Sequence, residues 1–464
     1  MPVSHRAATR TRSRTPLRVA VLADSDTRWK WGALTARRLA PGAPRGGPPG
    51  RIPGEAVGGD LHLTGYLLRG RATPTARQLG EVGVRADRLS EVTCAQFLAE
   101  IERERYDVVV LALVGGAVQA VLHGVRALWP EPAARPVLVT GYVGVVYEKL
   151  ADGLLLRHGA DLVLANSRYD AGRFRAVYEG VGADPDAVTQ TALPFLAGAP
   201  YEPALSRAHT VVFAVQPSVP DGRADRTYLL QRAARHARLH PGREVLIKLR
   251  SRPGEHTTHL EEQPYQRLAE RLPGGLPPNC RLVYGNMGEV LDRTDLLVTV
   301  SSTAALESLH RGIPTAVLTD LGVREVLGNH HFLGSGCLAS WDQLDAGLLP
   351  QGDPDWLDDQ GVTGTGDPFA AARARLVELL GRGELPAVAP YYTQATAPGY
   401  LPGILARHHL APDGTPLPGS VRQEGDGESR LRRRLRSHLR EAARGAYRHG
   451  VQRVAPVIRR LGEL

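Results

Sequence analysis

The sequence has few cysteines and no long apolar run, and these two absences exclude several classes of protein. Its 464 residues include only Cys94, Cys280 and Cys337, which are too far apart for a disulfide framework or a zinc motif. We therefore expect a reducing, cytoplasmic environment. No stretch approaches the roughly 18 consecutive apolar residues of a transmembrane helix. The basic segment 1–15 has no apolar core after it, so we expect a disordered tail there and no signal peptide.

The net charge of +9 is concentrated at one end of the chain. Residues 428–464 hold 11 Arg and 3 Glu, a net charge of +8, so the rest is close to neutral. A uniformly basic nucleic-acid binder is therefore excluded. Apolar residues recur every three or four positions from Leu431 to Val454, which predicts a basic amphipathic helix over 428–464. Such a helix could lie on an anionic membrane surface, dock on the protein's own acidic surface, or remain solvated.

Apolar runs alternate with helical segments twice along the chain. The clearest runs are Leu17–Ala23 and Asp107–Val114 in the first half, and Thr210–Gln216, Glu244–Leu249 and Asp295–Val300 in the second. Such runs are typical of buried parallel strands. We predict an α/β fold of two Rossmann-like, doubly wound domains, 16–195 and 209–385, that face a cleft. A hinge at 196–208 would join them, and a Pro- and Gly-rich linker at 386–427 would precede the basic helix.

Three acidic residues in the first domain follow predicted strands. Asp24 and Asp26 come directly after the first strand, and Glu148 comes after a later one. Ligands of open α/β sheets bind outside the carboxyl ends of the strands. Each carboxylate could therefore be a general base that deprotonates an acceptor hydroxyl. The alternatives are helix capping for the two aspartates and a solvated surface charge for Glu148.

Glycines follow two further strands of this domain, at Gly115 and Gly116 and again at Gly141 and Gly144. They would let an acceptor approach the backbone closely, or they simply form tight turns. The segment Trp29-Lys30-Trp31 places two tryptophans on different faces of one predicted helix. One ring could therefore stack on a sugar, although ordinary packing of both is the simpler interpretation.

Three hydroxyl residues, Ser301, Ser302 and Thr303, separate a strand in the second domain from a predicted helix. Free N–H groups and a partial positive charge at a helix start, together with these hydroxyls, would suit a phosphate or carboxylate. The alternative is that a hydroxyl only caps the helix. Glu307 lies about one helical turn further on, where it could accept hydrogen bonds from a ribose diol.

Positive charge gathers after another strand of the second domain, at Lys248, Arg250 and His256. An anionic ligand would be stabilised there, unless the segment is only a solvated basic loop. Gln216 begins the exit loop of the preceding predicted strand, and this loop would face the cleft. His256 and His259 have a spacing compatible with zinc, but a third ligand is not evident, so we predict no metal.

The Ser-Ser-Thr turn, Glu307 and the Gly-Ile-Pro at 312–314 resemble the nucleotide-binding element of GT-B glycosyltransferases. The Ser-Ser pair is most similar to that of bacterial sialyl- and polysialyltransferases and of the CDP-glycerol glycerophosphotransferases of wall teichoic acid synthesis. Over residues 15–385 the chain resembles a family of actinobacterial glycosyltransferases with no assigned substrate. Relatives carry a nucleotide-contacting His-Pro element near the position of His256. Their C-terminal helix, here 369–380, commonly crosses back to the first domain.

The resemblance implies a metal-independent glycosyltransferase that moves a sugar from a nucleotide-activated donor to a hydroxyl of a cell-surface glycan or glycolipid, without a separate cofactor. A base in the first domain would act with phosphate-stabilising groups in the second. Three alternatives remain open: a CDP-polyol-type phosphotransferase, a nucleotide-sugar epimerase, and a non-catalytic scaffold that uses the basic helix. We expect a cytoplasmic protein, at the inner face of the plasma membrane if that helix binds lipid.

Overall fold

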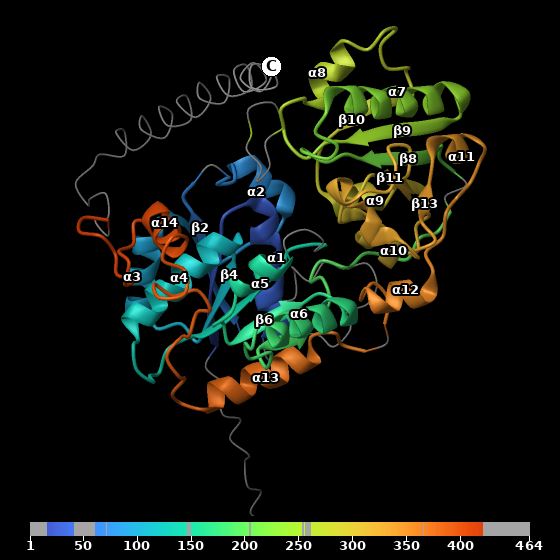
Figure 1. Cartoon of the computed structure of the whole chain (residues 1–464). Helices are drawn as coiled ribbons and strands as arrows, with labels where there is room; N and C mark the ends of the chain where they lie inside the picture. The colour runs from blue at the N-terminus through green and yellow to red at the C-terminus, as the bar shows by residue number, and fades with distance from the viewer. Residues whose placement is uncertain are drawn as a thin grey trace, which may run out of the picture.

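Two parallel sheets organise the residues that the structure describes, which are 16–40, 61–70, 72–145, 150–203, 206–252, 255, 261–364 and 366–420. The first sheet has seven strands in the order β3-β2-β1-β4-β5-β6-β7, and the second has six in the order β10-β9-β8-β11-β12-β13. In the computed structural model each sheet forms its own domain with helices packed around it (Figure 1). The predicted pair of Rossmann-like domains is confirmed.

The central strands of the first domain are apolar because helices cover both faces of the sheet. The strands are β1 Leu17–Ala23, β2 Leu61–Leu68, β3 Arg88–Val92, β4 Val108–Ala112, β5 Val137–Gly141, β6 Leu162–Ala165 and β7 Val188–Gln190. The helices are α1 Asp26–Leu39, α2 Ala76–Val82, α3 Cys94–Glu104, α4 Gly115–Leu128, α5 Leu150–Leu155 and α6 Arg168–Gly180. The edge strands β3 and β7 were not predicted, because they are short and carry polar residues instead of an apolar run.

The second domain repeats the alternation with shorter elements. Its strands are β8 His209–Ala214, β9 Arg243–Lys248, β10 Cys280–Val283, β11 Leu296–Thr299, β12 Thr315–Leu318 and β13 Leu338–Ala339. Its helices are α7 Arg223–Leu239, α8 Tyr265–Glu270, α9 Met287–Leu291, α10 Ala304–His310, α11 Trp341–Asp345 and α12 Pro354–Asp359, with 3-10 turns η1 Glu325–Leu327 and η2 Asn329–Phe332. The three apolar runs predicted as strands in this half form β8, β9 and β11.

After the second domain the chain returns to the first. Helix α13, Ala370–Gly381, lies beneath the first domain in Figure 1 and contacts α1, β5 and β7. Arg373 Nη1 donates a hydrogen bond to the Arg38 carbonyl at 2.9 Å. The crossing helix that the resemblance implied is therefore present, and it ties the end of the second domain to the first.

Residues 386–427 were predicted to form a linker. The described part of this segment, 386–420, instead packs against the first domain. Helix α14, Leu401–Arg407, packs against α4, and the Tyr392 carbonyl accepts a hydrogen bond from His123 Nε2 at 3.0 Å. Val388, Leu401 and Ile404 are buried in the core of the first domain. These buried residues were not predicted, because the segment is rich in Pro and Gly and its apolar residues are spaced too irregularly to give a periodic pattern.

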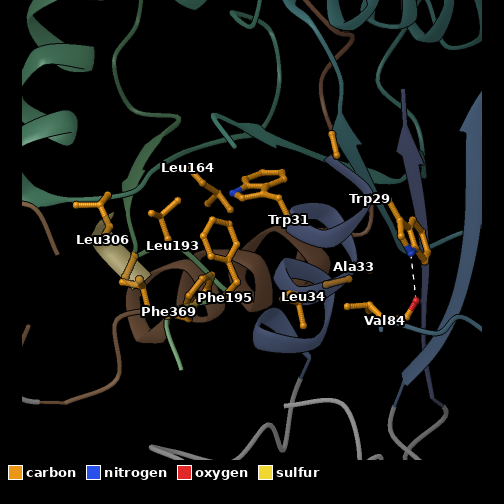
Figure 2. Packing of buried hydrophobic residues seen from close by; sticks show 14 of the residues in the cluster. Trp29, Trp31, Ala33, Leu34, Val84, Leu164, Leu193, Phe195, Leu306 and Phe369 are labelled. Atoms are coloured by element: carbon orange, nitrogen blue, oxygen red, sulfur yellow. Dashed lines mark hydrogen bonds between the residues drawn. The ribbon is translucent and has the colours of Figure 1, made fainter. Parts of the chain in front are cut away.

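Both tryptophans of α1 are buried, which confirms the packing interpretation. Figure 2 shows Trp31 beside Leu164 and Phe195, whereas Trp29 lies on the other side of the helix and donates from Nε1 to the Val84 carbonyl at 3.2 Å. Helix α1 is covered by β1, β2, α2 and α13, so two different faces of the helix are internal. Neither ring is therefore available to stack on a sugar.

None of the helices among the described residues is long and apolar enough to cross a membrane. The predicted basic segments 1–15 and 428–464 lie outside the described residues.

Candidate active site

A cavity of about 520 Å³ lies between the two domains. Its walls include the segments that follow the carboxyl ends of β1, β5, β8, β9, β10 and β11, together with part of α2. These are the strand ends where doubly wound sheets bind ligands. The size lies within the range of small-molecule sites in proteins. Three acidic and three basic side chains line it: Asp26, Glu81 and Glu307, and Lys30, Lys248 and Arg250.

The structure brings most of the predicted site residues into this one cavity. The lining includes Asp26 from the first domain and Gln216, Lys248, Arg250, Ser301, Ser302, Thr303 and Glu307 from the second. Two predicted residues, Glu148 and His256, lie outside the described residues, as does the predicted zinc partner His259.

Asp26 faces the second domain from the first turn of α1. Ser25 caps this helix by accepting a hydrogen bond from the Arg28 amide at 3.3 Å, so the aspartate itself is left to face the cavity. Arg250 Nη2 donates to Asp26 Oδ1 at 2.7 Å and also contacts the Thr27 hydroxyl. Burial alone would raise the pKa of Asp26, but the charge and hydrogen bonds of Arg250 and Thr27 outweigh it, and the pKa lies below its ordinary value.

A second ion pair crosses the cavity one helical turn further along α1. Lys30 Nζ lies 3.3 Å from Glu307 Oε2 and 4.6 Å from the centre of the Phe195 ring. Lys30 was not among the predicted site residues. The available signal was its spacing, because residues four apart on a helix share a face and Asp26 was already a candidate.

Lys248 is the most deeply buried cation of the cavity. Its Nζ donates to the Leu249 carbonyl at 2.7 Å, and only 7% of the residue is exposed. Burial lowers the pKa of Lys248 to about 8; nearby Glu81 opposes this shift, whereas Arg250 and Arg77 add to it. An anionic ligand in the cavity would relieve the cost of keeping this ammonium charged.

The three side chains of the hydroxyl turn differ in how deeply they are buried and in the hydrogen bonds that they make. Ser301 is almost fully buried, its amide donates to Gln216 Oε1 at 3.0 Å, and its hydroxyl donates to the Leu327 carbonyl at 2.6 Å. Ser302 Oγ accepts from the Ala304 amide at 3.2 Å, whereas Thr303, the N-cap residue of α10, makes no side-chain capping hydrogen bond. Ser302 and Thr303 are both partly exposed in the cavity wall. Helix α10 has only seven residues, so the local side chains matter more here than its dipole.

Of the four predicted glycines, only Gly144 meets the opposite domain. A Cβ built on it would lie 2.7 Å from Thr303 Oγ1. Gly115 and Gly141 instead admit core side chains, since a Cβ there would meet Leu156 at 2.8 Å and Trp31 at 2.9 Å respectively. Gly116 is the second residue of α4.

We predict that Gly144→Ala displaces the Thr303 side chain and weakens binding of a cavity ligand by about 1 kcal/mol, or about fivefold. Gly116→Ala is the matched control, because its Cβ would have no neighbour closer than 3.9 Å. Ligand titration of both variants measures the effect. Equal affinities in the two variants would show that the close approach of Gly144 and Thr303 is not needed for binding.

Asp24 does not line the cavity, and its hydrogen bonds connect two strands of the first domain. Its Oδ2 accepts from the Val114 amide at 2.9 Å and its Oδ1 from Arg28 Nη1 at 3.0 Å. It therefore joins the ends of β1 and β4. The geometry thus separates the two aspartates, and Asp26 is the one that faces the second domain.

One group in the described residues has the side chains of a metal site: His236, His240 and Asp345. Hydrogen bonds already engage all three. His236 Nδ1 lies 2.7 Å from Asp345 Oδ1, Arg243 Nη1 lies 3.2 Å from His236 Nε2, and His240 Nε2 lies 3.1 Å from the Asp345 carbonyl oxygen. Arg232 also donates to Asp345 at 3.1 Å. The arginines oppose a cation here, and none of these residues lines the cavity.

A family model matches residues 19–379, which contain both sheets and the cavity. The chain belongs to the family described as "Putative glycosyltransferase (DUF6716)". This membership supports a glycosyl-transferring enzyme. A search of curated proteins finds no match.

Solved structures with a similar arrangement are remote in sequence. A UDP-N-acetylglucosamine 2-epimerase is 14% identical, with a TM-score of 0.48, over 81% of this chain and 100% of that chain. The corresponding epimerase of Neisseria meningitidis, bound to UDP-GlcNAc, is 10% identical over 78% and 98%, with a TM-score of 0.47. HepE of Anabaena, in complex with UDP-glucose, is 11% identical over 84% and 98%, with a TM-score of 0.42.

Proposed function

We propose that this family member transfers a sugar from a nucleotide-activated donor to a hydroxyl of a glycan or glycolipid acceptor, without a metal ion. The observation that supports this most directly is the arrangement of charge in one cavity. Lys248 and Arg250 lie on the wall formed by the second domain, and Asp26 faces them from the first. Sugar transfer needs both kinds of group, a cation for the departing phosphate and a base for the attacking hydroxyl.

On the donor side, the second domain would bind the nucleotide. Lys248 and Arg250 would offset the negative charge that develops on the phosphate as its bond to the sugar breaks. The partly exposed hydroxyls of Ser302 and Thr303 would donate to the same phosphate oxygens. Glu307 would accept hydrogen bonds from the ribose, and Lys30, its partner from the first domain, would then help to hold the two domains around the donor.

On the acceptor side, Asp26 would take the proton of the attacking hydroxyl. The acceptor oxygen forms a bond to the anomeric carbon, the bond from that carbon to the phosphate oxygen breaks, and the proton remains on the carboxylate. Asp26 is a weak base while Arg250 holds it, because this contact lowers its pKa. A donor phosphate would draw Arg250 away. Burial would then raise the pKa of Asp26 at the moment when the donor is in place.

A thermal-shift panel with CMP, CDP, UDP, GDP and dTDP tests the donor site. A nucleotide at about 100 times its dissociation constant should stabilise the protein by about 2.7 kcal/mol. We expect one nucleotide to stabilise the wild type and to lose most of this effect in the Ser301→Ala/Ser302→Ala variant. Ser340→Ala is the matched control, because Ser340 caps α11 outside the cavity lining and its loss should lower stability without changing the nucleotide effect.

The identity of the stabilising nucleotide separates the remaining possibilities. CMP would indicate a sialyltransferase-like donor, CDP a polyol-phosphate donor, and UDP, GDP or dTDP a more usual sugar donor. Incubation of the wild type with the corresponding nucleotide sugar, with and without candidate acceptors, then distinguishes transfer from epimerisation. A panel in which no nucleotide stabilises the wild type would contradict the proposal and favour a non-catalytic scaffold.

A further inference from the structure

The cavity wall contributed by residues 216–220 has no regular secondary structure. Gln216, Pro217, Ser218 and Val219 all line the cavity, between β8 and α7. Outside a helix or sheet, the carbonyl groups of such a loop need hydrogen-bond donors from elsewhere. The position of this wall therefore depends on the group that supplies those donors.

Arg226 supplies them from the first turn of α7. Its Nη1 lies 3.0 Å from the Gln216 carbonyl oxygen, 3.1 Å from that of Pro217 and 3.0 Å from that of Pro220. Its Nη2 donates to Glu261 Oε1 at 2.5 Å, and its guanidinium lies 4.3 Å from the centre of the Tyr265 ring. The residue is fully buried. A planar guanidinium held on both sides in this way has little freedom to move.

The loop transmits this position to the hydroxyl turn through one side chain. Gln216 Oε1 accepts from the Ser301 amide at 3.0 Å, and Gln216 Nε2 donates to Ser301 Oγ at 3.2 Å. A continuous path of hydrogen bonds thus runs from Arg226 through the backbone and side chain of Gln216 to Ser301. Glu261, at the far end, fixes the guanidinium from the opposite direction.

We infer that Arg226 is a positioning residue of the donor site: it fixes the 216–220 loop and, through Gln216, sets the place of the Ser301 turn in the cavity. Arg226 does not itself line the cavity, so it acts without touching the ligand. The consequence for donor affinity rests on the proposed function. The consequence for the geometry of the turn does not.

Hydrogen–deuterium exchange of the full-length protein tests the geometry without any ligand. A lysine at position 226 offers a single ammonium and cannot bridge three carbonyls and a carboxylate in one plane. In Arg226→Lys we expect amides in residues 299–303 to exchange about tenfold faster, since the hydrogen bond that protects Ser301 opens more often. In Glu261→Gln, which keeps the arginine but removes its ion pair, we expect a smaller change at the same residues.

Arg232→Lys is the matched control. Arg232 lies on the same helix, is also buried, and pairs with Asp342 at 2.7 Å and Asp345 at 3.1 Å, away from the loop. It should lower thermal stability by an amount similar to Arg226→Lys without faster exchange at 299–303. Equal exchange at these residues in the two lysine variants would overturn the inference, because Arg226 would then be only a buried stabilising residue.

Nucleotide titration connects the geometry to the donor. We expect Arg226→Lys to bind the nucleotide selected by the panel about tenfold more weakly and Arg232→Lys to bind it normally. In a double-mutant cycle with Gln216→Ala, the two losses should not add, because both act through one path. Additive losses would contradict that path. If exchange at 299–303 is faster in Arg226→Lys but not in Arg232→Lys, and the wild type binds no nucleotide, the positioning role stands and the proposed function is rejected.

Discussion

Asp26→Asn is expected to lower kcat by about 10²- to 10⁴-fold, the usual contribution of a general base. The amide keeps an oxygen for Arg250, whose Nη2 donates to Asp26 Oδ1 at 2.7 Å, but it cannot take the proton of an acceptor hydroxyl. Nucleotide affinity should be unchanged or slightly higher, since the neutral amide competes less strongly than a carboxylate for Arg250. Initial rates of sugar transfer, together with nucleotide titration, measure the two effects separately.

Asp24→Asn is the matched control for this change. Asp24 lies two residues away, and an amide oxygen can still accept the hydrogen bond from the Val114 amide that Asp24 accepts at 2.9 Å. We expect this variant to keep kcat within about threefold of the wild type, because the amide oxygen can still accept hydrogen bonds at this position and Asp24 does not line the cavity. A large loss of kcat in Asp24→Asn with normal rates in Asp26→Asn would transfer the role of base to Asp24.

Lys248→Met is expected to stabilise the fold and to weaken nucleotide binding together. Burial lowers the pKa of Lys248 from its ordinary value of 10.5 to about 8, so the folded protein holds this proton less strongly than the unfolded chain does. At pH 7 the buried ammonium therefore costs up to about 3 kcal/mol, which a methionine of similar shape removes. Urea unfolding of both proteins at pH 7 measures the gain in the free energy of unfolding.

The pH dependence gives this prediction a definite sign. Between pH 8 and 10.5 the unfolded chain binds more protons at Lys248 than the folded protein, so this group makes the wild type more stable as the pH rises. The methionine variant should lack this contribution, and its advantage should shrink across the same interval. Nucleotide affinity of the wild type should fall above about pH 8, as the free ammonium loses its proton, whereas the variant should bind weakly at every pH.

Lys30→Met is the control for a cavity lysine that already has a partner. Lys30 is ion-paired with Glu307 across the cavity, and about a fifth of its side chain is exposed. Its loss should not stabilise the fold, because the Glu307 carboxylate would lose its partner. If both methionine variants stabilise the protein equally, apolar surface alone explains the gain, and the burial of the Lys248 charge is not its cause.

Much of the fold follows from local patterns in the sequence. Runs such as Leu17–Ala23 and Asp295–Val300 have a fully buried composition over a strand's length, and they form β1 and β11 within a residue of the predicted bounds. The hydroxyl turn was predictable for the same reason, because Ser301, Ser302 and Thr303 directly follow one of these strands. A parallel sheet places the carboxyl ends of its strands along one edge, so residues that follow these strands, such as Gln216, Lys248 and the turn, lie at the same edge.

The sequence by itself therefore determined the two sheets and the chemical character of each wall of the cavity. Only the tertiary structure decided which side chains meet across it. Asp26 and Arg250 are 224 positions apart, and Lys30 and Glu307 are 277 apart. Periodicity reports whether a segment is buried, but it does not report how two separately folded domains are oriented. Arg226 is a further example of this limit. Its three carbonyl partners are close to it in sequence, but only the path of the loop in the tertiary structure shows that they contact its guanidinium.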